Sequence, residues 1–296
     1  IALLAVIACL PRAVSARTFQ ASNSAGVQLT YHVIEGTATV EVAGGGHNKE
    51  KVVEVPARVS DGTSAYSVVR IGASAFAHCG NLEKVVLPET IRELGQSAFA
   101  SCFKLEDVVL PEGITEISEN AFGRCESLRE LRLPSTVTAI GNMAFVECSS
   151  LQSIDLPARL LTIGYFAFSR CTSLTEVDIP DTVVSVGQYA FSGCTSLKRA
   201  RLSDQITLVD QDLFSGCTSL AAIVIPRSVM YIEPYAFAGC TALRDITVQN
   251  PDPYGLSFGA GAFTDVPLDL CVLHVPAGSR SRYESTVPWT IFVNVR

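Results

Sequence analysis

Cysteine recurs at a spacing of 23 residues, in the series Cys79, Cys102, Cys125, Cys148, Cys171, Cys194, Cys217 and Cys240. Regularly spaced thiols can form disulfides or bind zinc. Equivalent positions on stacked coils lie about 5 Å apart with parallel side chains, which suits neither a disulfide nor four tetrahedral zinc ligands. We therefore interpret the series as buried structural thiols and expect no metal or other cofactor. Cys271 lies outside the series, at a strand position expected to point outward, and we interpret it as a lone reactive thiol.

Charged residues occupy two further positions of the same unit, five and seven residues after the cysteine. They include Glu176 and Arg199 at the first position, and Arg132, Asp155, Asp178 and Arg201 at the second. One interpretation is a solvated face whose opposite charges pair between coils, each pair contributing less than about 1 kcal/mol. The other is a strip that binds a partner, since repeat proteins recognise ligands along extended faces. The residue types leave both open.

Large side chains, most of them aromatic, stand directly before the Ala-Phe pair in several units, and we call them the aromatic row. It carries Met143, Phe166 and Tyr189, with Tyr235 two units further on. Exposed aromatic rings in a row could contact a protein or a carbohydrate. Alternatively, each side chain is partly buried against the neighbouring turn. The candidate binding residues are therefore the six charged side chains above together with Phe166 and Tyr189.

Composition and motifs exclude several other functions. The chain has 22 basic and 29 acidic residues and a net charge of −7, which argues against a nucleic-acid partner. Hydrophobic residues make up 48% of the 296, so the chain folds rather than remaining disordered. No nucleophile elbow, zinc-protease motif, phosphate-binding loop or dinucleotide fingerprint occurs. We expect a protein that is not an enzyme and has no catalytic residues.

The elements that carry these rows follow from the same period. Phenylalanine lies three residues before each cysteine, from Phe76 to Phe237, and leucine three residues after it, from Leu82 to Leu243. The unit reads C-x-x-L-x-x-V-x-L-P-x-x-I-x-x-I-G-x-x-A-F-x-x, in which V-x-L suits a short strand and proline ends it. We predict a single helical turn over residues 96–101. Repetition of this unit predicts an α/β solenoid, a right-handed superhelix of 23-residue coils with short parallel strands and columns of identical residues inside.

This repeat resembles the BspA-type leucine-rich repeat, over roughly residues 50–285. The asparagine of the common leucine-rich signature is absent, which the BspA type tolerates. The resemblance implies an exported or cell-surface module, since such repeats occur in bacterial adhesins that contact host matrix proteins. We therefore expect a protein partner bound through the extended face. The alternatives are a structural spacer of the envelope without a specific ligand and a carbohydrate-binding surface.

Both ends of the repeat region are irregular. Strand-like alternation over residues 27–31, 38–42 and 52–56 predicts a β-rich N-terminal cap, and Asp61-Gly62 predicts a turn. We place this cap and a first partial repeat at residues 17–70, and the leucine-rich repeat solenoid at 71–249. Residues 250–296 then form a last irregular repeat and a C-terminal cap.

The first sixteen residues resemble a targeting signal. Residues 1–10 are an unbroken apolar run, too short for a membrane-spanning helix, and Val14-Ser15-Ala16 supplies small residues for cleavage. The alternatives are lipidation at Cys9, which would anchor the chain, and a buried N-terminal strand. No other stretch suggests a transmembrane span. With no Asn-x-Ser/Thr sequon in the chain, we expect a secreted or cell-surface protein of bacterial type.

Overall fold

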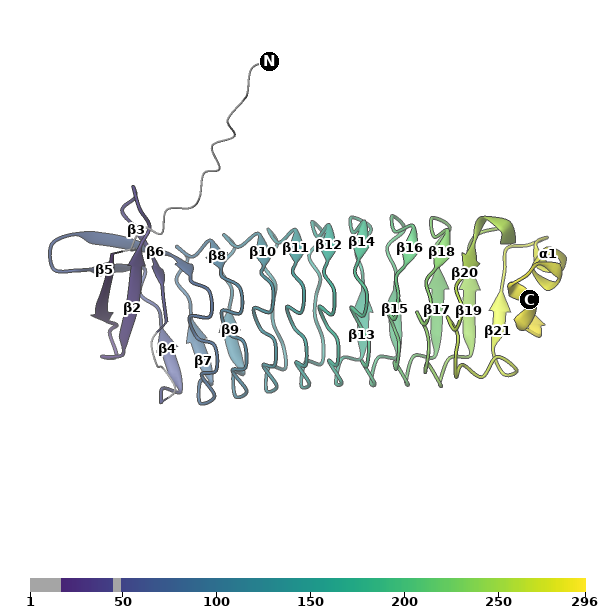
Figure 1. The fold of residues 1–296 in the computed structure, drawn as a ribbon, viewed down its shortest axis with the longest axis horizontal. Helices are drawn as coiled ribbons and strands as arrows, with labels where there is room; N and C mark the ends of the chain where they lie inside the picture. The colour runs from purple at the N-terminus through teal and green to yellow at the C-terminus, as the bar shows by residue number, and fades with distance from the viewer. Residues whose placement is uncertain (1–16, 45–48) are drawn as a thin grey trace, which may run out of the picture.

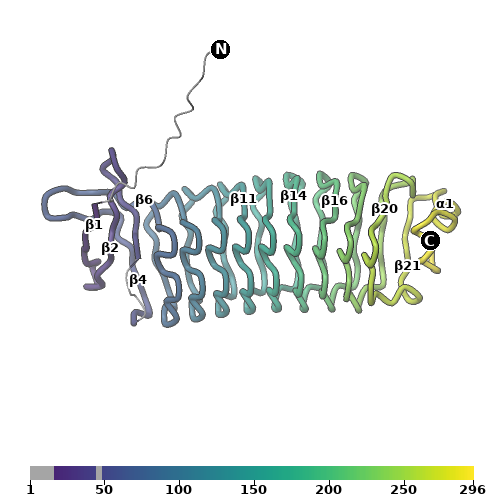
Figure 2. Tube along the Cα trace, viewed as in Figure 1, coloured from purple at the N-terminus to yellow at the C-terminus, as the bar shows by residue number. Residues whose placement is uncertain are grey.

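The computed structural model describes residues 17–44 and 49–296. The predicted signal segment, with its cleavage site and Cys9, lies outside the described residues. Coils of 23 residues stack along the long axis of the molecule, with a cap at each end (Figure 1). The solenoid predicted from the period is therefore present, and the tube trace shows the coils following one another at regular spacing (Figure 2).

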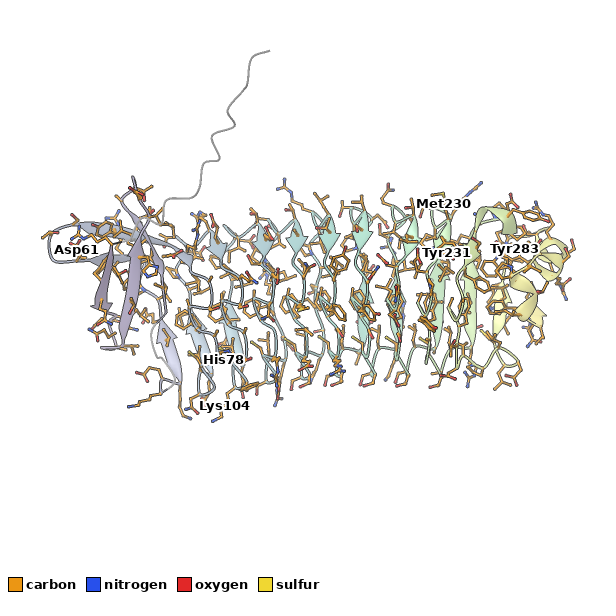
Figure 3. All side chains as sticks on the ribbon, viewed as in Figure 1. Asp61, His78, Lys104, Met230, Tyr231 and Tyr283 are labelled. Carbon is orange, nitrogen blue, oxygen red and sulfur yellow. The ribbon has the colours of Figure 1, made fainter. Side chains whose placement is uncertain are left out.

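The N-terminal cap is a sheet with strand order β1-β2-β3-β6-β5. Its strands are β1 (Thr18–Ser22), β2 (Gln28–Val33), β3 (Thr39–Val42), β5 (Arg58–Ser60) and β6 (Ala65–Ile71). β5 and β6 form an antiparallel hairpin, and the Asp61 carboxylate accepts hydrogen bonds from the backbone N–H groups of Thr63 and Ser64 in its turn. Asp61 lies at the N-terminal end of the molecule in Figure 3, and Tyr283 lies in the opposite cap.

Each coil contributes to one or both of two rows of short strands, visible in Figure 1. The first strand row contains β4 (Val52–Glu54), β7 (Lys84–Val86), β9 (Asp107–Val109), β13 (Glu176–Asp178), β15 (Arg199–Arg201), β17 (Ala222–Ile225), β19 (Asp245–Val248), β21 (Val272–His274) and β22 (Asn294–Val295). The second strand row contains β8 (Glu93–Leu94), β10 (Glu116–Ile117), β11 (Ala139–Ile140), β12 (Thr162–Ile163), β14 (Ser185–Val186), β16 (Leu208–Val209), β18 (Tyr231–Ile232) and β20 (Ser257–Phe258). The first row consists of the parallel sheets β4-β7-β9 and β13-β15-β17-β19-β21-β22. The second row consists of the parallel sheets β10-β11-β12-β14 and β16-β18-β20, together with β8, which pairs with β6 of the cap.

The interior consists of columns of identical side chains, as predicted. Neighbouring phenylalanines from Phe76 to Phe237 stack with ring centroids 5.1–5.7 Å apart and planes within 12° of parallel. The cysteines form a second buried column. The Cys148 thiol donates to the Phe122 carbonyl oxygen (3.1 Å), and Cys102, Cys125, Cys171, Cys194, Cys217 and Cys240 make the equivalent contact. The thiols thus act as small core residues that also satisfy a buried carbonyl group.

The predicted helical turn over residues 96–101 is wrong. Successive backbone N–H groups alternate between an acceptor in their own coil and one in the next coil. Ala98 donates to the Gly95 carbonyl of its own coil (3.1 Å), whereas Phe99 donates to the Ala121 carbonyl of the next coil (2.8 Å). An α-helix needs every N–H to reach back four residues along its own chain. Ser97 and Ser101 also take left-handed φ values of 57° and 60°, which interrupt a helix. The coil is therefore built from strands and turns, and the α/β description is corrected to a β-solenoid.

All helical segments among the described residues lie in the C-terminal cap. It includes η1 (Pro253–Gly255), α1 (Arg280–Ser285) and η2 (Trp289–Ile291). Trp289 and Tyr283 are buried over the last coil, where Phe258 and Phe292 meet the Trp289 ring. Among residues 17–44 and 49–296, no helix combines the length and apolar character needed to cross a bilayer.

The interpretation of Cys271 as an exposed reactive thiol is also wrong. Cys271 is fully buried, whereas Leu270 before it is 58% exposed. Cys271 lies two positions before the inward-pointing Leu273, whereas in the regular coil before it Leu243 lies three positions before Ile246. The shorter spacing turns Cys271 into the core, where burial raises the pKa of its thiol to about 11.

Candidate functional site

The outward side chains of the first strand row form two lines along the solenoid. Parallel pairing places Glu176 beside Arg199 and Asp178 beside Arg201, and the next strand adds Ala222 beside Arg199. Their intervening residues, such as Val177, are buried, so successive side chains alternate between the core and solvent. The two predicted columns therefore lie on one exposed face.

Between these two lines runs a groove of about 650 Å³, which we call the charged groove. It is lined by Ser153, Ile154, Asp155, Glu176, Val177, Asp178, Arg199, Ala200, Arg201, Ala222, Ile223 and Val224. Five of the six charged residues singled out from the sequence thus come together. Arg132 is the exception: it is exposed one coil before Asp155 and does not line the groove.

Arg201 is fixed by two carboxylates. Its guanidinium donates to Asp178 (3.0 Å) and to both carboxylate oxygens of Asp181 (2.6 and 2.7 Å). These contacts, with Asp181 first, raise the pKa of Arg201. The pKa of Asp181 is lowered, first by the backbone N–H of Asp204 and then by Arg201. Asp178 and Arg201 therefore match the interpretation of paired surface charges and are the least available to a partner.

The other three charges of the groove are not neutralised. Among the described residues, Asp155, Glu176 and Arg199 form no ion pair, although Glu176 and Arg199 lie in register on neighbouring strands. The groove therefore presents two carboxylates at one end and a guanidinium further along. Beyond Arg199 the lining becomes apolar, with Ala222 and the 42% exposed Val224. Such a surface complements a partner that carries basic, acidic and apolar groups in sequence.

The aromatic row is only partly exposed. Phe166 and Tyr189 are half-buried and stack on each other, with ring centroids 4.5 Å apart, whereas Met143 and Tyr235 are exposed. The Tyr189 hydroxyl accepts a hydrogen bond from the Gln211 side-chain amide (3.2 Å). A hydrogen bond to the Asp212 carboxylate raises the pKa of Tyr189. Stacking between coils thus accounts for much of the surface of both rings.

Sequence reasoning missed a second groove, of about 380 Å³, over the second strand row. Its side chains include Glu116, Glu119, Asn142, Tyr165 and Asp210. The signal available in the sequence is the glycine at the same position of three successive units, Gly141, Gly164 and Gly187, which Asp210 replaces in the next. In the part of the chain that the structure describes, no three His, Cys, Asp or Glu side chains gather closely enough to hold a metal ion.

The stacked coils, the inner phenylalanine and cysteine columns and the grooved outer face define a solenoid repeat protein. The chain belongs to the family described as BspA type leucine rich repeat region, which matches residues 69–184 and 138–266 in 6 copies. This establishes the resemblance drawn from the sequence.

The chain is similar to solved structures of leucine-rich repeat proteins. The protein TpLRR of T. pallidum is 28% identical over 73% of this chain and 87% of its own, with a TM-score of 0.52. A leucine-rich repeat protein from Bacteroides ovatus is 24% identical over 86% and 94% of the two chains, with a TM-score of 0.44. A leucine-rich cell surface protein from Faecalibacterium prausnitzii is 22% identical over 90% and 97%, with a TM-score of 0.41. No curated protein matches the chain in sequence.

Proposed function

We propose that this chain is an exported, surface-type repeat protein that binds a protein partner through the charged groove. The observation that carries the proposal is the set of three unneutralised charges of both signs, Asp155, Glu176 and Arg199, on one groove. Exposed charges without partners add nothing to the stability of the fold, whereas they can steer and orient a charged partner. Membership of the BspA-type family supports a repeat protein of the surface type.

The shape of the groove favours an extended segment of polypeptide. The lining residues come from four successive coils, so the groove follows the solenoid axis. Its floor is made by residues such as Ile154 and Val177, whose side chains are buried in the core. A bound segment would place basic side chains near Asp155 and Glu176, an acidic one near Arg199, and an apolar one near Val224.

The test measures binding of the full chain to a panel of purified extracellular matrix proteins by biolayer interferometry. The triple variant Asp155→Ala, Glu176→Ala, Arg199→Ala should weaken binding to a captured protein at least tenfold, or about 1.4 kcal/mol. Raising the salt concentration should weaken the wild type more than the triple variant, because salt screens exposed charges. The matched control replaces the exposed charges Glu106 and Arg159, outside the groove, with alanine.

Two results would contradict the proposal. Equal affinity of the triple variant and the wild type would remove the charged groove from the binding face. Failure of every protein in the panel to bind would favour the alternative of a spacer without a specific ligand. Retention of the control's affinity is needed to assign the loss to the groove rather than to the removal of exposed charges elsewhere on the surface.

A further inference from the structure

The second groove differs from the charged groove in how its floor is made. A Cβ atom at Gly141, Gly164 or Gly187 would lie 2.7, 2.6 or 2.7 Å from a backbone nitrogen of the preceding coil. Real side chains do not tolerate such approaches, so glycine allows the coils to meet closely there. The floor is therefore bare backbone, and we call this site the glycine-floored groove. It runs across the coils of β11, β12 and β14 and ends at Asp210.

Tyr165 supplies an aromatic platform in this groove. Its side chain is 53% exposed, and its backbone N–H donates to the Asn142 side-chain oxygen (3.0 Å). The ring lies against the next coil, where its Cδ1 is 2.9 Å from the position that a Cβ at Gly187 would occupy. Glycine at 187 therefore allows the ring to rest on the floor while about half of the side chain stays accessible.

Hydrogen-bonding groups surround the platform. Glu116 has no hydrogen bond or ion pair with any described side chain, and Glu119 accepts one hydrogen bond, from the Gln96 amide (3.1 Å). Hydroxyl-bearing residues Thr162 and Ser185 also line the groove, and no lysine, arginine or histidine does. Carboxylates that retain free acceptor positions can receive hydrogen bonds from several donors at once.

The backbone beside the platform is held in a costly conformation. Phe166 and Tyr189, on the two coils that carry Tyr165 and Gly187, have left-handed φ values of 55° and 59°. Bulky side chains in this region cost about 1–2 kcal/mol per residue, and earlier coils place Ser97 and Asn120 at the same position. The equivalent residue of the other coils, including Met143 and Tyr235, takes the same conformation, so it is a feature of the repeat that the residues beside the groove share.

We propose that the glycine-floored groove binds a neutral oligosaccharide. The apolar C–H face of a sugar ring would stack on Tyr165, and its hydroxyl groups would donate to Glu116, Glu119 and Asp210. An anionic ligand would be repelled by these three carboxylates. A site with one aromatic surface and several convergent polar groups is the usual form of a small-ligand site. This site lies on the second strand row and does not depend on the charged groove.

The test uses isothermal titration calorimetry of the full chain with cellohexaose, chitohexaose and maltohexaose. At least one should bind, Tyr165→Ala should weaken that binding tenfold or more, and Tyr165→Phe should keep most of it because the ring remains. Tyr254→Ala is the matched control, since Tyr254 is 80% exposed and outside the groove. Glu116→Gln with Glu119→Gln should weaken binding severalfold and provides a second route should Tyr165→Ala fail to fold.

The proposal is overturned if no oligosaccharide binds at millimolar concentration. It is also overturned if Tyr165→Ala and the glutamine pair leave the affinity unchanged. Tighter binding of hexalysine than of any sugar would identify the groove as a site for cations instead. The triple variant of the charged groove should bind the sugar like the wild type, so the two proposals fail separately.

Discussion

Removing the ring of Phe145 perturbs the interior stack at its centre. The side chain is fully buried, and its ring lies 5.6 Å from that of Phe122 and 5.1 Å from that of Phe168. Truncating a buried phenylalanine to alanine costs about 3–5 kcal/mol, because apolar burial is lost and a cavity remains. With an m-value of about 3 kcal/mol/M, that loss lowers the urea midpoint by about 1–1.7 M.

The assay is urea unfolding of Phe145→Ala followed by circular dichroism. Phe103→Ala is the control, because Phe103 is 38% exposed and contacts the Arg124 guanidinium at the surface. We expect the control to lose less than about 1.5 kcal/mol. Each coil contacts chiefly its neighbours, so the loss of stability should concentrate in the coils around Phe145, where hydrogen exchange of the backbone amides measures it. Equal losses in the two variants would refute the interior stack.

Three further changes probe the backbone approach, a buried hydroxyl and a buried thiol. Gly164→Ala should cost about 1–3 kcal/mol in urea unfolding, since its Cβ would collide with the preceding coil, whereas Gly80→Ala, whose nearest neighbour is 3.9 Å away, should cost little. Tyr31→Phe should stabilise the chain by about 1 kcal/mol in thermal unfolding, because the buried Tyr31 hydroxyl has no hydrogen-bond partner among the described residues; a destabilised variant would contradict this. Cys271 should resist a thiol reagent at pH 8 in the native state and react once the chain is unfolded. Its burial blocks access of the reagent, and its raised pKa of about 11 suppresses the reactive thiolate. Rapid labelling of Cys271 in the native state, located by mass spectrometry, would refute its burial.

The repeating architecture could be predicted from the sequence because the 23-residue spacing fixes which residues stack. The phenylalanine and cysteine columns follow directly from that register. Two local features did not follow. The turn over residues 96–101 divides its N–H groups between coils, which helix propensity does not encode. Cys271 turns inward because it lies two positions, rather than three, before the inward-pointing Leu273, and the regular spacing of the unit placed it outside.

The candidate site was partly predictable for the same reason. Strand alternation places Asp155, Glu176 and Arg199 on the outer face, as expected from their positions in the unit. The ion pair between Arg201 and Asp181 was not predictable. The two residues occupy different positions of the unit and are not paired in strand register, so only the length of the Arg201 side chain brings them into contact. The glycine-floored groove was missed because its floor is backbone, which a pattern of side-chain types does not describe.

Carboxyl footprinting tests most directly whether the outer face of the first strand row binds the partner. The native chain would be treated with a carbodiimide and an amine, alone and with a captured protein partner, and modified residues located by mass spectrometry. We expect the partner to protect Asp155 and Glu176 at least threefold while Glu116 and Glu119 react as before. Unchanged labelling of Asp155 and Glu176 in a saturated complex would contradict it.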